Sequence, residues 1–177
     1  QIDTRAIEKF NIPGLIPMEN AAVKTVDIIF KYYNLSSKVI VVAGGGNNGG
    51  DGLAIARHIF FKGIPVEVVM LADVQKLPVD AKANLDMILN LDIPITTIKD
   101  DQHTNSLSGI FKGAGLIIDA IFGTGLSKPV KGRYLSAIEA INKSNIPVVS
   151  VDIPSGIDGE TGHVMGSAVK ASHTVTY

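Results

Sequence analysis

The chain has 177 residues, of which 18 are glycine, none is cysteine and 46% are hydrophobic. This length suits a single domain with a sizeable core, and the lack of cysteine excludes disulfides and cysteine-ligated metals. Sixteen basic and seventeen acidic side chains give a formal charge of −1, so we expect no general attraction to nucleic acid or to an anionic membrane. No apolar run reaches membrane-spanning length, and the first residues lack the basic and apolar segments of a signal peptide, so a cytoplasmic protein is expected.

The predicted elements alternate between helices and strands along the chain. A helix is expected first, over Met18–Tyr33, because apolar residues recur there at a spacing of three to four. The β-branched run Lys38–Ala43 then predicts a strand that is buried on both faces. Further helices are expected at Leu53–Phe61, at Val79–Leu89, near Leu107 and at Tyr134–Asn142, and further strands at Val66–Leu71, Ile95–Ile98, Leu116–Ile118, Val148–Val151 and His173–Tyr177. This order predicts an α/β protein, a Rossmann-like three-layer α/β/α sandwich with a mostly parallel, doubly wound sheet.

A glycine-rich segment, Gly44–Gly52, follows the first predicted strand. Gly44, Gly46 and Gly49 match the dinucleotide fingerprint, and backbone N–H groups at the start of a helix form an anion site. A tight turn with positive φ is the alternative explanation for the glycines, and N-capping is the alternative for Asp51. A carboxylate at this place repels a phosphate unless a cation or a proton compensates, so Asp51 argues against simple pyrophosphate docking. We expect this segment to bind a ligand.

Two further predicted strands end in an acid. Asp119 follows Leu-Ile-Ile and opens a loop that contains Lys128, and Asp152 follows the next strand in equivalent position. If these strands are neighbours, both carboxylates would converge with Asn48 and the Ser155 hydroxyl, and together they could bind a cation of low charge. These residue types do not decide whether the cation is K⁺, Na⁺ or Mg²⁺. The alternative for Asp119 is a carboxylate that is hydrogen-bonded to loop N–H groups and binds no cation. Lys128 could contact a phosphate, and the alternative is a solvated side chain.

Three segments, in this order, closely resemble the YjeF N-terminal domain family, the NAD(P)H-hydrate epimerases. They are Gly-Asn47-Asn48-Gly-Gly-Asp51-Gly, Asp119-Ala-Ile-Phe-Gly-Thr-Gly and Asp152-Ile-Pro-Ser155-Gly-Ile-Asp-Gly. The resemblance runs from Met18-Glu-Asn-Ala to Tyr177, and we treat residues 1–177 as one domain of this type. Because members of the family usually continue further, we expect the domain to lack its C-terminal end.

The resemblance implies an enzyme that interconverts the R and S forms of nicotinamide cofactor hydrated at C6, NADHX or NADPHX. It would supply the S form to an ATP- or ADP-dependent dehydratase, either separate or fused. The resemblance also implies one K⁺ per subunit, and we expect a homodimer. The family's substrate-contacting positions match Asn47, Asn48, Gly49, Gly50, Asp51, Gly123, Thr124, Gly125, Leu126, Ser127, Lys128, Pro129 and Asp152, and its K⁺-holding positions match Asn48, Asp119 and Ser155.

Inversion at C6 requires loss and return of hydroxide through a ring iminium, or reversible ring opening, and both routes need an acid/base group. We assign that role to Asp152, with Asp51 as the second candidate. A non-catalytic binding or scaffold domain of the same fold is one alternative, which the intact acids disfavour. An NAD-dependent dehydrogenase is another, but it would have only Asp73 as a ribose-binding acid and no obvious catalytic histidine.

Overall fold

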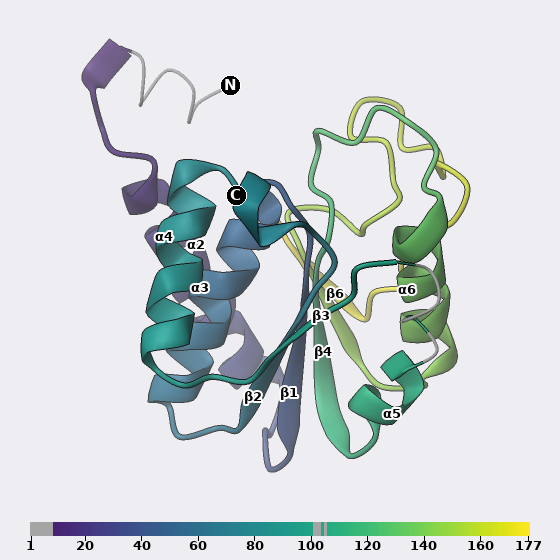
Figure 1. Ribbon diagram of the computed structural model, residues 1–177, viewed down its shortest axis with the longest axis horizontal. Coiled ribbons are helices and arrows are strands. Elements are labelled where there is room, and N and C mark those ends of the chain that lie inside the picture. Colours follow the sequence, from purple (N-terminus) through teal and green to yellow (C-terminus); the bar gives the residue numbers. More distant parts are fainter. Residues whose placement is uncertain (1–8, 101–103, 105) are drawn as a thin grey trace.

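The computed structural model describes residues 9–100, 104 and 106–177, and it shows a sheet between two layers of helices (Figure 1). The helices are α2 (Leu15–Tyr32), α3 (Asn47–Phe61), α4 (Val79–Asn90), α5 (Leu107–Phe111) and α6 (Gly132–Lys143), with a short 3₁₀ helix η1 (Val74–Lys76). The strands are β1 (Lys38–Ala43), β2 (Val66–Met70), β3 (Ile95–Thr97), β4 (Ala114–Ala120), β5 (Val148–Val151) and β6 (His173–Val175). Each neighbouring pair in the order β3-β2-β1-β4-β5-β6 is parallel, which confirms the predicted fold.

The sheet separates two apolar cores. On one face, α2, α3 and α4 cover a core that includes Val39 and Val41, and on the other face α5 and α6 cover a core that includes Ile40 and Val42 (Figure 1). Because both faces of β1 are buried, its sequence is a continuous apolar run instead of an alternating one. In the described part of the chain, no helix is both long enough and apolar enough to cross a membrane.

The order of the strands in the sheet changes direction at β1. The chain places β2 and β3 on one side of β1, and then β4, β5 and β6 on the other side. The chain leaves β1 toward α3 on one face of the sheet and leaves β4 toward α6 on the other face (Figure 1). The two loops therefore diverge, and in open parallel sheets this divergence creates the crevice in which ligands bind.

Two element boundaries differ from the predicted ones in ways that affect this crevice. Helix α3 begins at Asn47 instead of Leu53, and its N-cap is Gly46, so the proposal that Asp51 caps the helix is wrong. Strand β4 continues to Ala120, so Asp119 lies inside the strand and not after it. The other boundaries fall close to the predicted ones.

Candidate active site

A cavity of about 660 Å³ opens at the carboxyl ends of β1, β4 and β5. It lies between the start of α3, the loop after β4 and the start of α6, and its volume is in the range of small-molecule pockets. The lining residues are Gly45, Gly46, Asn47, Asn48, Asp51, Ile121, Phe122, Gly123, Thr124, Gly125, Leu126, Ser127, Lys128, Tyr134 and Asp152.

Asp152 enters the cavity from a strained turn at the end of β5. Its φ is +68°, and the N–H of Ile153 donates to the carbonyl of Val151 at 2.9 Å, which makes a γ-turn with Asp152 at its centre. Positive φ is unfavourable for a residue that has a Cβ. The turn directs the carboxylate toward the loop after β4, where the N–H of Thr124 donates to Oδ2 at 3.0 Å. A Cβ on Gly123 would lie 2.7 Å from that oxygen, so only glycine leaves the carboxylate its room.

Asp51 lines the same cavity from α3, and a phenol lies near both acids. Burial raises the pKa of Tyr177, and the negative charges of Asp51 and Asp152 raise it further, against the lowering effect of a hydrogen bond with Thr25. That hydrogen bond joins the Tyr177 hydroxyl to the Thr25 hydroxyl on α2. Sequence reasoning singled out neither residue, because no local pattern signals a contact between segments so far apart in the chain.

Asp119 has no exposed surface, and four hydrogen bonds surround its carboxylate. Oδ2 accepts from the Ser150 hydroxyl at 2.7 Å and from the Ser155 N–H at 2.9 Å. Oδ1 accepts from the Ser155 hydroxyl at 2.5 Å and from the Ile121 N–H at 3.3 Å. Burial raises the pKa of the Asp119 carboxyl, and the hydrogen bonds oppose that increase without cancelling it. A carboxylate in such a place is stabilised by any positive charge that reaches it.

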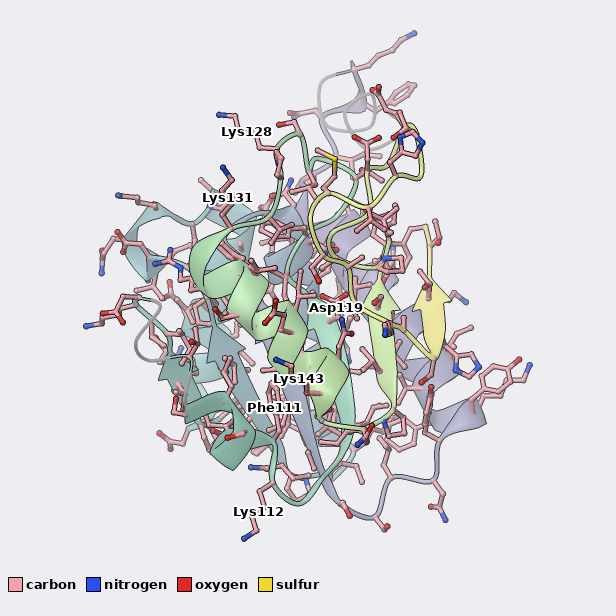
Figure 2. All side chains as sticks on the ribbon, turned by 90° about the vertical axis from the view of Figure 1, so that its right-hand side faces the viewer. Phe111, Lys112, Asp119, Lys128, Lys131 and Lys143 are labelled. Atoms are coloured by element: carbon pink, nitrogen blue, oxygen red, sulfur yellow. The ribbon has the colours of Figure 1, made fainter. Side chains whose placement is uncertain are left out.

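The expectation that Asp119 and Asp152 occupy equivalent places is wrong. Asp119 is paired in register with Ser150 inside β5, whereas Asp152 comes after that strand. Figure 2 shows Asp119 at the centre of the molecule, below the loops that surround the cavity. The two acids therefore belong to different levels of the site: Asp152 lines the cavity and Asp119 lies beneath it.

Asn48, which lines the cavity, carries a side-chain amide without a hydrogen-bond partner among the described residues. The side chain is only 8% exposed, and neither its Oδ1 nor its Nδ2 has a hydrogen-bond partner among the described residues. The Asn48 side chain lies against Gly123. Phe122, the residue before Gly123, donates its N–H to Ser155 Oγ at 2.9 Å. Asn48 is thus connected through this loop to Ser155 and Asp119. One carboxylate with neutral oxygens fits a monovalent cation better than Ca²⁺, which gathers more carboxylates.

Gly44 and Gly49, in the segment after β1, allow close packing of the protein against its own backbone. A Cβ on Gly44 would lie 2.0 Å from the carbonyl oxygen of Ile121, and one on Gly49 would lie 2.1 Å from the carbonyl oxygen of Gly44. No glycine of the segment 44–52 has positive φ, so the tight-turn explanation is wrong. The start of α3 can approach the ends of β1 and β4 only because these positions lack side chains.

Most of the expected substrate contacts line the cavity, and three do not. Gly49 and Gly50 face the interior of the protein, and a Cβ on Gly50 would lie 2.8 Å from the terminal methyl of Met18. Pro129 comes directly after Lys128, the last residue of that loop that lines the cavity. The lining also includes residues that were not predicted, namely Gly45, Gly46, Ile121, Phe122 and Tyr134. Phe122 lies within the quoted Asp119 segment and could have been included. Tyr134 had no signal in the sequence, because it lies in the first turn of α6, outside the three segments that carry the resemblance.

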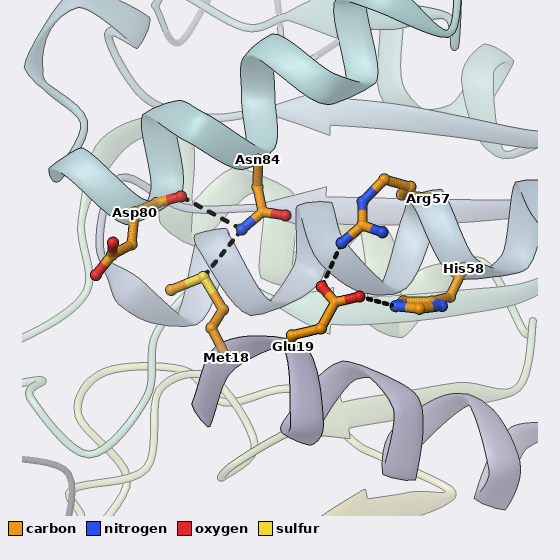
Figure 3. A network of polar contacts seen from close by, with 6 residues as sticks. All are labelled: Met18, Glu19, Arg57, His58, Asp80 and Asn84. Carbon is orange, nitrogen blue, oxygen red and sulfur yellow. Dashed lines mark hydrogen bonds and ion pairs between the residues drawn. The ribbon is translucent and has the colours of Figure 1, made fainter. Parts of the chain in front are cut away.

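Polar contacts join α2 to both α3 and α4 (Figure 3). Glu19 on α2 accepts a hydrogen bond from the Arg57 guanidinium, and its other carboxylate oxygen lies 2.7 Å from Nε2 of His58. Burial alone would raise the pKa of Glu19, but the hydrogen bonds and charges of these two partners lower it below its usual value. On α4, the side-chain amide of Asn84 donates to the sulfur of Met18 at 3.2 Å. The contacts of Glu19 thus tie α2 to α3, the helix that also carries Asn48 and Asp51, whereas the Asn84 contact ties α2 to α4.

Comparison with known proteins agrees with this geometry. Residues 15–177 match the family described as YjeF-related protein N-terminus. The chain is 41% identical over 175 residues to an NAD(P)H-hydrate epimerase of Limosilactobacillus fermentum, which covers 99% of this chain and 80% of that protein. It is 40% identical over 176 residues to the bifunctional NAD(P)H-hydrate repair enzyme Nnr of Thermofilum pendens, but it spans only 33% of that protein's length. The crystal structure of the yeast protein YNL200c has a TM-score of 0.86 and 25% identity, with 99% of this chain and 75% of the yeast chain covered.

Proposed function

Because the chain belongs to the family of YjeF-related protein N-termini, we propose that it is an epimerase domain for hydrated NAD(P)H. The observation that carries this proposal is the cavity with two acids, Asp51 and Asp152, in a chain that is 41% identical to an NAD(P)H-hydrate epimerase. The cavity volume of about 660 Å³ accommodates a nucleotide-sized ligand.

Epimerisation inverts C6, the ring carbon that bears the hydroxyl group. Loss of hydroxide leaves a ring iminium, and return of water to the opposite face gives the other form, unless the ring opens and closes instead. Loss of hydroxide requires a group that gives a proton to the leaving oxygen and takes one from the incoming water. Ring opening requires a group that takes the proton of the C6 hydroxyl as the bond between C6 and the ring nitrogen breaks, gives a proton to that nitrogen, and reverses both transfers when the ring closes. Asp152 is suited to this role because its turn and the Thr124 N–H fix the carboxylate in the cavity. Asp51 on α3 is the second candidate.

A K⁺ ion is assigned to Asn48, Asp119 and Ser155. The unpartnered Asn48 amide and the fully buried Asp119 carboxylate support this assignment. When bound, the ion supplies positive charge next to a carboxylate that lacks it and below a cavity that receives a diphosphate. The Ser155 hydroxyl already bonds to Asp119, so the chain holds part of this arrangement in place.

The product of the reaction is a hydrate in the S form, which a dehydratase converts back to NAD(P)H. Some relatives of this chain carry the name bifunctional NAD(P)H-hydrate repair enzyme, and others are named epimerase alone. These names support a functional partner in the repair of hydrated NAD(P)H, either fused or separate, and we propose that it is the ATP- or ADP-dependent dehydratase that the family resemblance implies.

A dehydrogenase is disfavoured by the structure of the glycine segment. Gly44 and Gly49 pack against the protein's own backbone, as described above. Asp73, the candidate for binding a cofactor ribose, caps η1 by accepting from the Gln75 N–H at 3.1 Å, and it does not line the cavity. A scaffold function leaves the two acids of the cavity without a purpose.

The test is incubation of a mixture of R and S hydrates with an S-specific dehydratase, with and without this chain. We expect the dehydratase alone to repair the S fraction quickly and the R fraction only at its spontaneous rate of conversion. With the chain present, the whole mixture should be repaired quickly. The same slow repair of the R fraction in both reactions would refute the epimerase proposal.

A further inference from the structure

A short hairpin follows β5. It comprises residues 156–166, in which Ile157 and Val164 form an antiparallel bridge and the N–H of Met165 donates to the carbonyl of Gly156 at 2.8 Å. All of these residues are described, and none of them lines the cavity. Figure 1 shows this segment, which we call the 156–166 hairpin, beside the loop that joins β4 to α6.

The 156–166 hairpin contacts the loop after β4 at both ends of that loop. At the far end, the Val130 N–H donates to the carbonyl of Met165 at 2.8 Å. At the near end, the tip of the hairpin lies against Thr124, since a Cβ on Gly159 would be 3.0 Å from both Cα and Cβ of Thr124. The tip can approach Thr124 this closely because Gly159 has no side chain.

The loop after β4 depends on such contacts for its shape. Its residues 123–129 include two glycines, and most of them are exposed. An exposed segment with glycines has many backbone conformations of similar free energy, so contacts with neighbouring segments select one of them. The Thr124 N–H, which donates to Asp152 Oδ2 at 3.0 Å, therefore takes its position in large part from the hairpin tip.

Asp158 fixes the tip of the hairpin. Its Oδ1 accepts from the N–H of Glu160 at 3.0 Å and from the N–H and the hydroxyl of Thr161 at 2.7 and 2.8 Å. The hydrogen bonds from Thr161 and Glu160 lower the pKa of the Asp158 carboxyl, so this acceptor is ionised at neutral pH. Ionised acceptors form stronger hydrogen bonds than neutral ones, and Gly159 lies inside the turn that these bonds close.

We infer that Asp158 is a positioning residue for the Asp152 carboxylate, an inference that rests on the proposed function. Asp158 closes the turn that holds Gly159 against Thr124. The Thr124 N–H in turn orients the Asp152 carboxylate in the cavity. Asp158 does not line the cavity, so it acts on the reaction only through these contacts. Since a misplacement of about 1 Å can slow an enzymatic reaction about 100-fold, loss of this support should be visible in kcat.

The amide proton of Thr124 reports this positioning without turnover. We would follow its nuclear magnetic resonance signal in K⁺ buffer, with Asp152→Gly as the reference in which the acceptor is absent. Asp158→Ala removes the acceptor at the tip, whereas Asp158→Asn keeps an oxygen that can accept the same hydrogen bonds. Glu160→Ala is the matched control, because it removes an exposed side chain from the same turn and keeps the N–H that donates to Asp158.

In Asp158→Ala, we expect the Thr124 signal to move most of the way toward its position in Asp152→Gly. In the epimerase assay, kcat of Asp158→Ala should fall about tenfold, while Asp158→Asn and Glu160→Ala should leave the signal in place and kcat within about twofold. Asp158→Ala should not slow the Asp152→Gly chain further, since no carboxylate is left to position. A merely structural defect of the hairpin would lower kcat in both backgrounds.

Three results would overturn the inference: an unchanged Thr124 signal in Asp158→Ala, an unchanged kcat in that variant, or an equal fall of kcat with and without the Asp152 carboxylate. Thermal unfolding shows whether Asp158→Ala is folded. If it is not, Thr161→Val takes its place, because it removes one hydrogen bond to Asp158 and should move the signal part of the way.

The positioning of Asp152 and the proposed reaction can fail separately. If the Thr124 signal depends on Asp158 but the chain does not epimerise the hydrates, the proposed reaction fails while the contacts from Asp158 to Asp152 stand. If the chain epimerises the hydrates and the Thr124 signal does not depend on Asp158, only the positioning role of Asp158 fails.

Discussion

Three substitutions at Asp152 separate its carboxylate from its strained backbone. Asp152→Asn keeps a side chain that tolerates positive φ and keeps an oxygen that can accept from the Thr124 N–H, but it removes the acid. Asp152→Gly relieves the strain and loses the hydrogen bond. Asp152→Ala loses the hydrogen bond and places a Cβ without polar compensation at φ +68°.

The expected stabilities follow from these contacts. A left-handed residue with a Cβ costs about 1 kcal/mol, and the lost hydrogen bond costs about another 1 kcal/mol. Asp152→Ala keeps the left-handed cost that Asp152 already carries and loses the hydrogen bond, so it should be destabilised by about 1 kcal/mol, or about 2–4 °C in melting temperature for a domain of this size. Asp152→Gly gains about 1 kcal/mol from relief of the strain and loses about 1 kcal/mol with the hydrogen bond, so its stability should be close to that of the unchanged chain. The stability of Asp152→Asn should also be close to it.

Activity should follow a different order from stability. All three variants lack the acid, so each should slow conversion of R to S by about 100-fold or more in the coupled dehydratase assay. Thermal unfolding followed by circular dichroism supplies the stabilities. If Asp152→Ala were as stable as Asp152→Gly, which also lacks the hydrogen bond, the argument from the γ-turn would be refuted. If Asp152→Asn retained full turnover, Asp152 would have no part in the proton transfer.

The remaining predictions concern packing, pH and the cation. Gly49→Ala should lower the free energy of unfolding in urea by about 3 kcal/mol, because its Cβ would lie 2.1 Å from a backbone oxygen. Gly46→Ala, whose Cβ would have nothing within 4 Å, should lower it by under about 1 kcal/mol. Equal costs for the two variants would contradict the packing argument. Folding lowers the pKa of Glu19, so its contribution is present above the ordinary value of 4.5 and is lost as the pH falls through the lowered pKa. Because this side chain is partly exposed, Glu19→Gln should cost only about 1 kcal/mol at neutral pH and progressively less as the pH falls below 4.5. A cost that does not decline at acid pH would count against the ion pair. Exchange of K⁺ for tetramethylammonium at equal ionic strength should lower both the melting temperature and the activity of the unchanged chain. It should not change the melting temperature of Asp119→Asn, which lacks the buried carboxylate. Identical values for the unchanged chain in both salts would disprove the cation assignment.

The sheet could be predicted because each strand carries its own signal. The run Val39–Val42 is apolar at every position, as a strand covered on both faces must be. The start of α3 could not be predicted in the same way, since the segment Asn47–Gly52 is rich in residues that disfavour helices. Its helical conformation depends on contacts such as Gly52 against Ala120, where a Cβ would lie 2.5 Å from the alanine methyl. Such contacts join separate elements and leave no trace in a local pattern.

The candidate site shows the same division. The place of Asp152 after a strand followed from the strand pattern, but its positive φ results from pairing of its N–H with the Val175 carbonyl on β6 and from the turn beyond it. Asp119 was recognised as unusual, but its depth depends on how far β4 continues, which no single residue signals. Tyr134 approaches the cavity only after α6 packs on the sheet.

The divergence of the loops after β1 and β4 builds this cavity from separate segments of chain. Asn48 and Asp51 come from the start of α3, Asp152 from the turn after β5, and Lys128 from the loop after β4. The sheet beneath them is buried on both faces and stays in place when a loop changes. The range of ligands that the cavity accepts can therefore be altered in the loop after β4, by evolution or by design, while the strands that carry the site are retained.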